Sequence, residues 1–430
     1  IGNGFQNIAT APYSSIVNGC CNISCGNYSF IGSGLKNSIS GSYGTIVGGC
    51  SNVVATANSS VVGGTCNCVC AGVNSMVLGG TCNFANDTAG YSAILGGFRN
   101  CSCGTQVNLV FGQCNITSNC WATVLNGFRS CATGCQSSVL SGGINNLSSG
   151  WLGLIAGGST NQAVGINSSI INANRSCAVG NFSSIIAGGF HCNCVQQGLV
   201  GNGSYNYLCN SAGADCSWGA TIINGIGNNS TGGTFTFTGN CGAGCFTVAP
   251  TICNAGCFSL IGNGFQNIAT APYSSVVNGF CNYVTSLHSS IIGGRKNLVI
   301  SSYSSIVGGC SNTIFSGGTY STISGGYSNS IYSLESSIGG GSSNQICTSA
   351  FDSTISGGYL NTISCNNNAS LIGGGARNTI CYDINSSSNL SLIGGGLCNF
   401  ICGNNLSSII NGQFNNICCC SQVSLIGGGD

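Results

Sequence analysis

The chain has 430 residues, with 72 Gly, 33 Cys, 3 Pro and only 3% charged residues. This composition excludes a helical protein, because surface helices need the Lys, Glu, Gln and Leu that the chain lacks. The net charge of +1 leaves no basic stripe for nucleic acid, and Gly pairs break the apolar runs before any segment is long enough for a membrane span.

From its first residue the chain repeats a unit of about 15–17 residues, Ser-Ser-Ile-Val-Gly-Gly-x-x-Asn-x-Ile. This period is too short for helical or propeller repeats and is typical of one coil of a β-solenoid. We therefore predict an all-β fold, a parallel β-solenoid (β-roll), over residues 1–228. The repeated Asn falls at Asn7, Asn22, Asn37, Asn52, Asn67, Asn83, Asn100 and Asn115.

Residues 44–54 show how one coil is expected to fold. Ile46 and Val53 flank a Gly pair and an Asn, which predicts two short strands joined by a tight turn. Stacked coils place equivalent side chains above one another, so we predict a buried ladder of Asn amide hydrogen bonds. The aliphatic residues expected in the interior are Ile16, Ile31, Ile46, Val61, Val77, Ile94, Ile292, Ile306, Ile323, Ile338 and Ile355.

The repeat is interrupted once, over residues 229–260. The alternation in 234–238, Thr-Phe-Thr-Phe-Thr, predicts a β-strand in this segment. Four cysteines follow it, Cys241, Cys245, Cys253 and Cys257. We predict a Cys-rich β insertion or junction between two solenoid arrays.

A second array is predicted over residues 261–430. It begins with Ile261–Ser275, which repeats Ile1–Ser15 residue for residue and indicates growth by duplication. Its repeated Asn are Asn267, Asn282, Asn297, Asn312, Asn329, Asn344, Asn361, Asn378, Asn399 and Asn416.

The 33 Cys favour an oxidising compartment, in which they cross-link within or between coils, for example Cys20 with Cys50. Two alternatives remain, free Cys as small core residues and thiolate metal sites such as Cys192-x-Cys194 with His191 or Cys418-Cys419-Cys420. The candidate disulfide cysteines are Cys20, Cys50, Cys66, Cys68, Cys70, Cys101, Cys103, Cys241, Cys245, Cys253 and Cys257.

Asn-x-Ser/Thr sequons add support for secretion. The candidate glycosylation sites are Asn22, Asn58, Asn86, Asn115, Asn146, Asn167, Asn181, Asn202 and Asn405. With the cysteines, they predict an extracellular, cell-surface or virion-surface location.

Titratable side chains are too few and too scattered to build a catalytic site, so we expect no enzyme and no cofactor. The only His are His191 and His288, and the only Glu is Glu335. Aromatic residues recur directly after the glycines, as at Phe128 and Phe190. We expect them to pack against a neighbouring molecule or, alternatively, to bind glycans.

The repeated string over 1–228 and 261–430 resembles the head repeats of trimeric autotransporter adhesins, in which Ser-Val-Ala-Ile-Gly-x-x-Ala units build a parallel β-roll. It is also similar to Gly-Gly-x-x-Asn repeats of viral and phage fibres. The resemblance implies a solenoid architecture.

We expect a non-enzymatic structural protein that self-associates into a disulfide-stiffened fibre, sheath or surface layer. The alternative is an adhesin or receptor-binding fibre that presents variable loops for attachment. A cysteine-based metal store is the third hypothesis. The expected partners are copies of the chain itself and, for the adhesin, host or cell-surface glycans.

Overall fold

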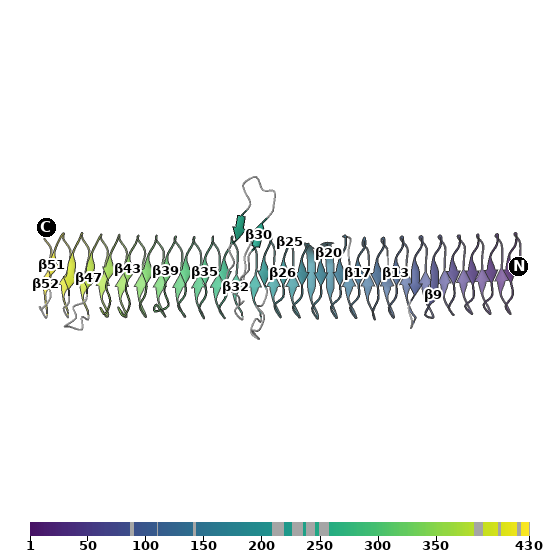
Figure 1. Ribbon diagram of the computed structural model, residues 1–430, viewed down its shortest axis with the longest axis horizontal. Coiled ribbons are helices and arrows are strands. Elements are labelled where there is room, and N and C mark those ends of the chain that lie inside the picture. Colours follow the sequence, from purple (N-terminus) through teal and green to yellow (C-terminus); the bar gives the residue numbers. More distant parts are fainter. Residues whose placement is uncertain are drawn as a thin grey trace. The chain divides into compact units, whose positions relative to one another are not determined.

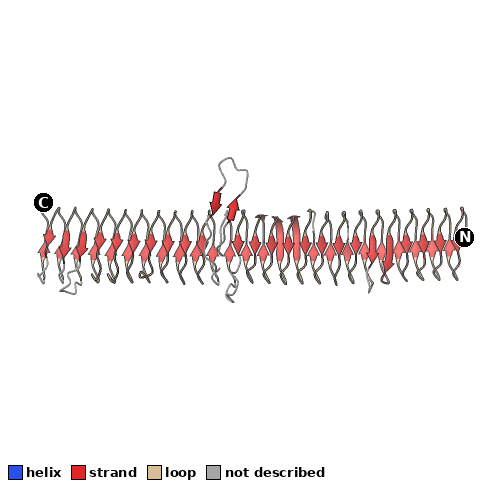
Figure 2. Cartoon of the chain, viewed as in Figure 1, coloured by secondary structure: helices blue, strands red, loops and turns tan. Residues whose placement is uncertain are grey.

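The computed structural model describes residues 1–86, 90–109, 111–140, 143–208, 219–225, 258–381, 390–402, 406–418 and 423–429, and the backbone of 235–237 and 246–248. All regular structure in these residues is β, without a helix (Figure 2). The predicted fold is confirmed as a parallel β-solenoid of about 24 turns with coils of about 15 residues. The chain divides into two compact units, Ile1–Asn202 and Gly203–Asp430.

Each coil contributes two short strands, and each strand pairs in parallel with its equivalent in the next coil (Figure 1). Ile8 pairs with Ile23 in the first sheet, and Ile16 pairs with Ile31 in the second. The strands are short because glycines and turn residues follow each aliphatic pair, and these residues favour bends over extended backbone.

In unit 1, the first-sheet strands are β1 Ile8–Ala9, β3 Ile23–Ser24, β5 Ser38–Ile39, β7 Val53–Val54, β9 Cys68–Ala71, β11 Phe84–Asn86, β13 Cys101–Ser102, β15 Ile116–Thr117, β17 Cys131–Ala132, β19 Leu147–Ser148, β21 Gln162–Ala163, β23 Cys177–Ala178 and β26 Cys192–Asn193. The second-sheet strands are β2 Ser15–Ile16, β4 Phe30–Ile31, β6 Thr45–Ile46, β8 Ser60–Val61, β10 Met76–Val77, β12 Ala93–Ile94, β14 Asn108–Leu109, β16 Thr123–Val124, β18 Ser138–Val139, β20 Leu154–Ser159, β22 Ser169–Asn174, β24 Ser184–Ile185, β25 Gly188–Gly189 and β27 Leu199–Val200.

In unit 2, the first-sheet strands are β28 Tyr207–Leu208, β33 Ile268–Ala269, β35 Tyr283–Val284, β37 Leu298–Val299, β39 Thr313–Ile314, β41 Ser330–Ile331, β43 Gln345–Ile346, β45 Thr362–Ile363, β47 Thr379–Cys381, β49 Phe400–Cys402 and β51 Asn416–Ile417. The second-sheet strands are β29 Thr221–Ile222, β32 Leu260–Ile261, β34 Ser275–Val276, β36 Ser290–Ile291, β38 Ser305–Ile306, β40 Thr322–Ile323, β42 Ser337–Ile338, β44 Thr354–Ile355, β46 Leu371–Ile372, β48 Leu392–Ile393, β50 Ser408–Ile409 and β52 Leu425–Ile426.

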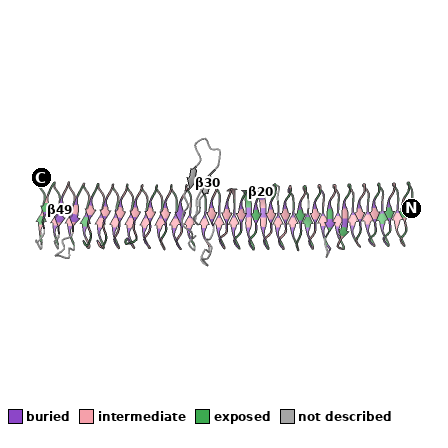
Figure 3. Cartoon of the chain, in the orientation of Figure 1, coloured by how far each residue is buried: buried purple, intermediate pink, exposed green. Residues whose placement is uncertain are grey.

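The core of each unit lies between its two sheets (Figure 3). In most strands the first residue points outward and the second inward, because successive side chains in a strand alternate between faces. The predicted interior residues are buried with one exception. Ile292 is 48% exposed, whereas its neighbour Ile291 is fully buried in register with Val276 and Ile306. The prediction for Ile292 was therefore wrong by one residue, which turns a strand side chain to the opposite face.

The interruption lies between two strands that pair directly, since β29 and β32 align Ile222 with Ile261. Within it, β30 (Phe235–Phe237) pairs in antiparallel fashion with β31 (Phe246–Val248), so the predicted alternating segment contains a strand. Cys241, Cys245, Cys253 and Cys257 lie outside the described residues.

Candidate functional site

Each coil has two turns, and the first, which we call the asparagine corner, ends on the repeated Asn. Asn37 is representative: its backbone N–H donates to Oδ1 of Asn22 at 2.9 Å, and its own Oδ1 accepts from the N–H of Asn52 at 3.0 Å. Its Nδ2 donates to the carbonyls of Ser33 (3.2 Å) and Gly49 (3.0 Å). Asn37 therefore links three successive coils, because its side chain bonds to the next coil and its backbone N–H bonds to the preceding one.

The predicted amide ladder needs correction in its chemistry, because most of these bonds join a side chain to the backbone. Within the described residues, direct amide-to-amide bonds occur at only a few coils, such as Asn22 to Asn7 at 3.1 Å. The backbone turns at each corner, so its polar groups lack strand partners, and the short Asn side chain reaches them.

The repeated Asn occupy this position along both units, and most are fully buried. The last one was assigned wrongly. Asn415 donates its N–H to Oδ1 of Asn399 at 3.1 Å, whereas Asn416 is the outward first residue of β51. The sequence signal that identifies Asn415 as the ladder residue is the glycine three residues before it, Gly412.

That glycine is required for two reasons, as Gly309 illustrates. Its φ is +87°, which side chains disfavour, and an added Cβ would collide with the carbonyl of Gly326 and the Asn312 amide. The preceding Gly308 meets nothing within 4 Å of such a Cβ. Of the two repeated glycines, only the second is fixed by packing.

All seven Lys and Arg of the chain lie at asparagine corners, just before the Asn position. Six have positive φ, namely Lys36, Arg99, Arg129, Arg175, Lys296 and Arg377, and Arg295 directly precedes Lys296. The net charge alone does not reveal that the cations share one corner of the coil. Within each unit the cations share one edge, although uncharged coils separate most of them.

Four of these cations stack on phenylalanine rings. The guanidinium carbons lie 4.9 Å (Arg99 on Phe98), 5.0 Å (Arg129 on Phe128), 5.3 Å (Arg175 on Phe190) and 5.4 Å (Arg295 on Phe280) from the ring centroids. The aromatic positions noted after the glycines thus hold arginine side chains against the corner.

The second turn, which we call the serine corner, places a residue with positive φ before a buried Ser, as in Tyr28 and Ser29. Aromatic rings stack along it. Tyr28 lies 4.6 Å from Tyr13 and 5.0 Å from Tyr43 between ring centroids, with nearly parallel planes. Ring faces inside such a stack are covered by the neighbouring rings, so a sugar meets mainly ring edges and hydroxyls. The arrangement disfavours stacking of glycans on these faces.

Two acidic residues, Glu335 and Asp352, also lie at serine corners, with φ of 54° and 55°. A side-chain hydrogen bond with Asp352, the charge of Asp352 and partial desolvation raise the pKa of the Glu335 carboxyl. In the described part of the chain, positive and negative charges therefore occupy opposite corners and leave both sheet faces uncharged.

The second-sheet face carries an exposed apolar row that the sequence predictions missed. We call it the outer aliphatic column. Each member directly follows a buried aliphatic residue and is 36–53% exposed. The Ile-Val pair of the repeat contains the signal, because its second residue must point away from the core. The members are Val17, Val47, Val62, Leu78, Leu125, Leu140, Ile171 and Ile186 in unit 1 and Ile223, Val277, Ile292, Val307 and Ile410 in unit 2.

The cysteines lie mainly on the outer surface, and Cys68 and Cys70 form a disulfide. The predicted bridge between Cys20 and Cys50 is wrong, because Leu35 lies between them in the ladder. Two coil spacings amount to about 10 Å, beyond the reach of a disulfide. Cys20 and Cys50 are thiols in this structure, as are the candidates Cys66, Cys101 and Cys103.

Some candidate glycosylation sites are buried and others are exposed. Asn22, Asn115 and Asn146 are ladder residues with at most 1% exposure, so they cannot carry a glycan in the folded chain. Five others are exposed, Asn58, Asn86, Asn167, Asn181 and Asn202, and Asn405 lies outside the described residues.

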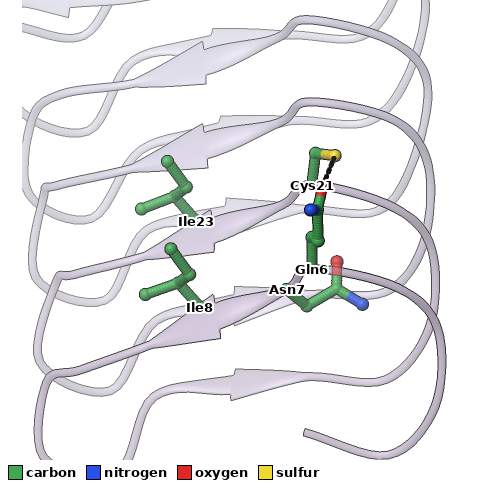
Figure 4. A pocket seen from close by; sticks show the side chains of 5 residues that line it. All are labelled: Gln6, Asn7, Ile8, Cys21 and Ile23. Carbon is green, nitrogen blue, oxygen red and sulfur yellow. Dashed lines mark hydrogen bonds between the residues drawn. The ribbon is translucent and has the colours of Figure 1, made fainter.

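One open depression lies on the first two coils and is lined by Gln6, Asn7, Ile8, Cys21 and Ile23 (Figure 4). The Cys21 thiol donates to Oε1 of Gln6 at 3.5 Å. The duplicated pair in unit 2 makes the same bond, from Cys281 to Gln266 at 3.2 Å. The depression is thus a feature of the repeat, and its five lining residues do not indicate a particular ligand.

In the described ranges, no group of three His, Cys, Asp or Glu side chains is placed to hold a metal ion. The same residues contain no helix capable of crossing a membrane. The sequence matches no protein-family model and no curated protein.

Proposed function

We propose that the chain is a non-enzymatic structural protein that self-associates into a fibre, sheath or surface layer outside the cell or on a virion. The outer aliphatic column is the observation that carries this proposal. The Cys68–Cys70 disulfide and the 33 Cys support the location, since disulfides persist in oxidising compartments.

The column favours association between flat sheet faces. Its side chains are about half-exposed, so each contributes on the order of 1 kcal/mol when a second copy covers it. Charged side chains on a sheet face would oppose such contacts, because they would lose water without gaining a partner, and here the charges lie at the corners. The column spans three successive coils at Val47, Val62 and Leu78, and three again at Val277, Ile292 and Val307. Such an apolar row on an uncharged face marks an interaction surface.

The experiment replaces Val47, Val62 and Leu78, on three successive coils, by lysine. Sedimentation velocity at micromolar concentration should show large species for the original chain and monomers for the variant, with unchanged circular dichroism. A matched control places lysines on the opposite sheet face, at Ile23, Phe84 and Ile116. Assembly that survives the first variant, or that is lost equally in both, contradicts the proposal.

The cation row favours a second candidate, attachment to an anionic surface glycan. Two of its guanidiniums are held against Phe98 and Phe128 at corners two coils apart, with the uncharged corner of Gln113 between them. In this case Arg99→Gln with Arg129→Gln should lower the salt concentration that elutes the chain from a sulfated polysaccharide column. Equal elution of variant and original chain argues against this candidate.

A further inference from the structure

Two positions of the coil form a recurring site for paired thiols. The ladder position is the place of the repeated Asn in each coil, which other residues, such as His191, occupy in a few coils. The first and third residues after it are called the dithiol positions. After Asn67 they hold Cys68 and Cys70, which are joined as a disulfide with a Cα–Cα distance of 5.4 Å. The residue between them, Val69, is fully buried.

The backbone explains why these positions suit a disulfide. When the middle residue points into the core, the first and third side chains both point outward. Disulfides need Cα atoms about 4.4–6.8 Å apart, and the coil geometry at Cys68 and Cys70 meets this requirement.

The same positions hold two further cysteine pairs in unit 1. Cys101 and Cys103 flank the buried Ser102, and their Sγ atoms lie 2.6 Å apart. Cys192 and Cys194 flank the buried Asn193, with Sγ atoms 3.3 Å apart. Both pairs therefore reproduce the arrangement at Cys68 and Cys70.

We propose that Cys101–Cys103 and Cys192–Cys194 are redox-active dithiol sites that close to disulfides by exchange with a low-molecular-weight disulfide. One cysteine loses its proton, and its thiolate attacks the small disulfide, forming a mixed disulfide and releasing one small thiolate. The second cysteine then loses its proton, and its thiolate attacks the protein sulfur of that mixed disulfide; the two protons released pass to the small thiolates or to water. This step forms the bond within the coil and releases the second small thiolate, so the pair is oxidised and the small disulfide reduced.

The environment of Cys101 makes the rate of disulfide closure depend on pH. Burial, a hydrogen bond with Cys103 and the nearby Cys103 charge raise the pKa of the Cys101 thiol to about 12. Because the thiolate is the nucleophile, closure that starts at Cys101 accelerates as the pH rises toward that value.

The chain contains its own control. Cys131 occupies the first dithiol position two coils beyond Cys101, and Thr133 occupies the third. It shares the strand position of Cys101 and has no thiol at the third position. The other cysteine of this coil, Cys135, lies at the serine corner, where its side chain forms a hydrogen bond with Cys120.

The test uses the full chain, reduced, freed of reductant and exposed to oxidised glutathione. Remaining thiols are then blocked with N-ethylmaleimide and the peptides analysed by mass spectrometry. The peptide with Cys101 and Cys103 should lose two hydrogens and carry neither label nor glutathione. Cys131 should carry one of them, and Cys68–Cys70 reports that oxidation has taken place.

Two variants sharpen the test. Cys103→Ser should leave glutathione trapped on Cys101, and Thr133→Cys should create a new closed pair with Cys131. Label or glutathione on both Cys101 and Cys103, under conditions that restore Cys68–Cys70, overturns the proposal. If a variant fails to fold, the peptide map of the original chain alone decides the question, and it does so independently of assembly.

Discussion

At the scale of single residues, the repeated Asn stabilises the fold by pairing backbone groups that the strands leave open. Asn100 donates to the carbonyls of Gly96 (3.0 Å) and Gly112 (2.9 Å), and its Oδ1 accepts from the N–H of Asn115 at 3.0 Å. These groups lie in a buried turn, so water cannot replace the side chain.

Replacing Asn100 by alanine should therefore destabilise the protein. Each unsatisfied buried group costs about 1–3 kcal/mol, and several are left open. Chemical denaturation followed by circular dichroism measures the loss. Asn108→Ala is the control, because Asn108 is exposed on β14 of the adjoining half-coil. A similar loss in both variants contradicts the role assigned to the ladder.

The two glycines before Asn312 should differ in their tolerance of a methyl group. Gly309→Ala forces a Cβ against the next coil and a disfavoured positive φ, which costs about 1–3 kcal/mol from the backbone conformation alone. Gly308→Ala adds its Cβ to open space and should change stability little. Thermal melts of the two variants test the pair, and equal melting temperatures would be inconsistent with this packing.

The carboxyl pair of Glu335 and Asp352 predicts that the stability of the fold depends on pH. The pKa of Glu335 is raised above its ordinary value of 4.5, so the folded chain holds that proton more tightly than the unfolded chain. Its stabilising contribution is complete below the unfolded value and is lost as the pH rises through the folded value. Glu335→Gln should flatten this part of the melting temperature profile, and an unchanged profile would argue against coupling of the pair.

At the scale of elements, the sequence predicts the coils and their strands well. It predicts less well which side chains point into the core and which point outward. Gly-Gly-x-x-Asn and the 15-residue step identify the strands and the ladder, because both recur with every coil. The predictions were wrong by one residue at Ile292 and at Asn416, where two similar residues are adjacent. In a strand of two residues, only the packing of neighbouring coils distinguishes inward from outward.

The left-handed residues show a further limit of the sequence. Cys21, Lys36 and Tyr43 all have φ between 55° and 58°, although none is a residue type that favours this region. Their conformation is imposed by stacking, as the N–H of Cys21 donates to the carbonyl of Phe5 at 2.8 Å. The side chains at these positions vary freely, so the corners give little sequence signal beyond their Gly and Asn.

A pair of substitutions tests the facing of the second-sheet strands. Ile291→Lys places a charge in the core of β36 and should unfold the neighbouring coils, because a buried unpaired charge is strongly unfavourable. Ile292→Lys places the same charge on the outer aliphatic column and should preserve the fold. Circular dichroism and limited proteolysis separate the two, and the reverse order of stability contradicts the assigned register.

The disulfide of Cys68 and Cys70 stabilises the fold differently from a cross-link between coils. A bridge between adjacent coils closes a loop of about 15 residues and contributes about 3 kcal/mol, whereas a bond within one coil closes a much shorter loop. The Cys68–Cys70 bond therefore contributes less to the predicted stiffening of a fibre than a bridge between coils would.

At the scale of the whole molecule, each unit is a one-dimensional stack whose coils are stabilised by their neighbours. Repetition turns a property of one residue position into a property of a face. Where the residue after the buried aliphatic one is apolar, it belongs to the outer aliphatic column, and the positions just before the ladder residue, Asn or Ser, hold all seven cations. Composition alone hides this segregation, because it depends on which repeat position each residue occupies.

Sedimentation velocity of the untagged chain at neutral pH and micromolar concentration tests the central claim, self-association through the outer aliphatic column, most directly. We predict species larger than the monomer that grow with concentration and disappear when Val47, Val62 and Leu78 become lysine. A stable, monodisperse monomer over the whole concentration range would contradict this claim.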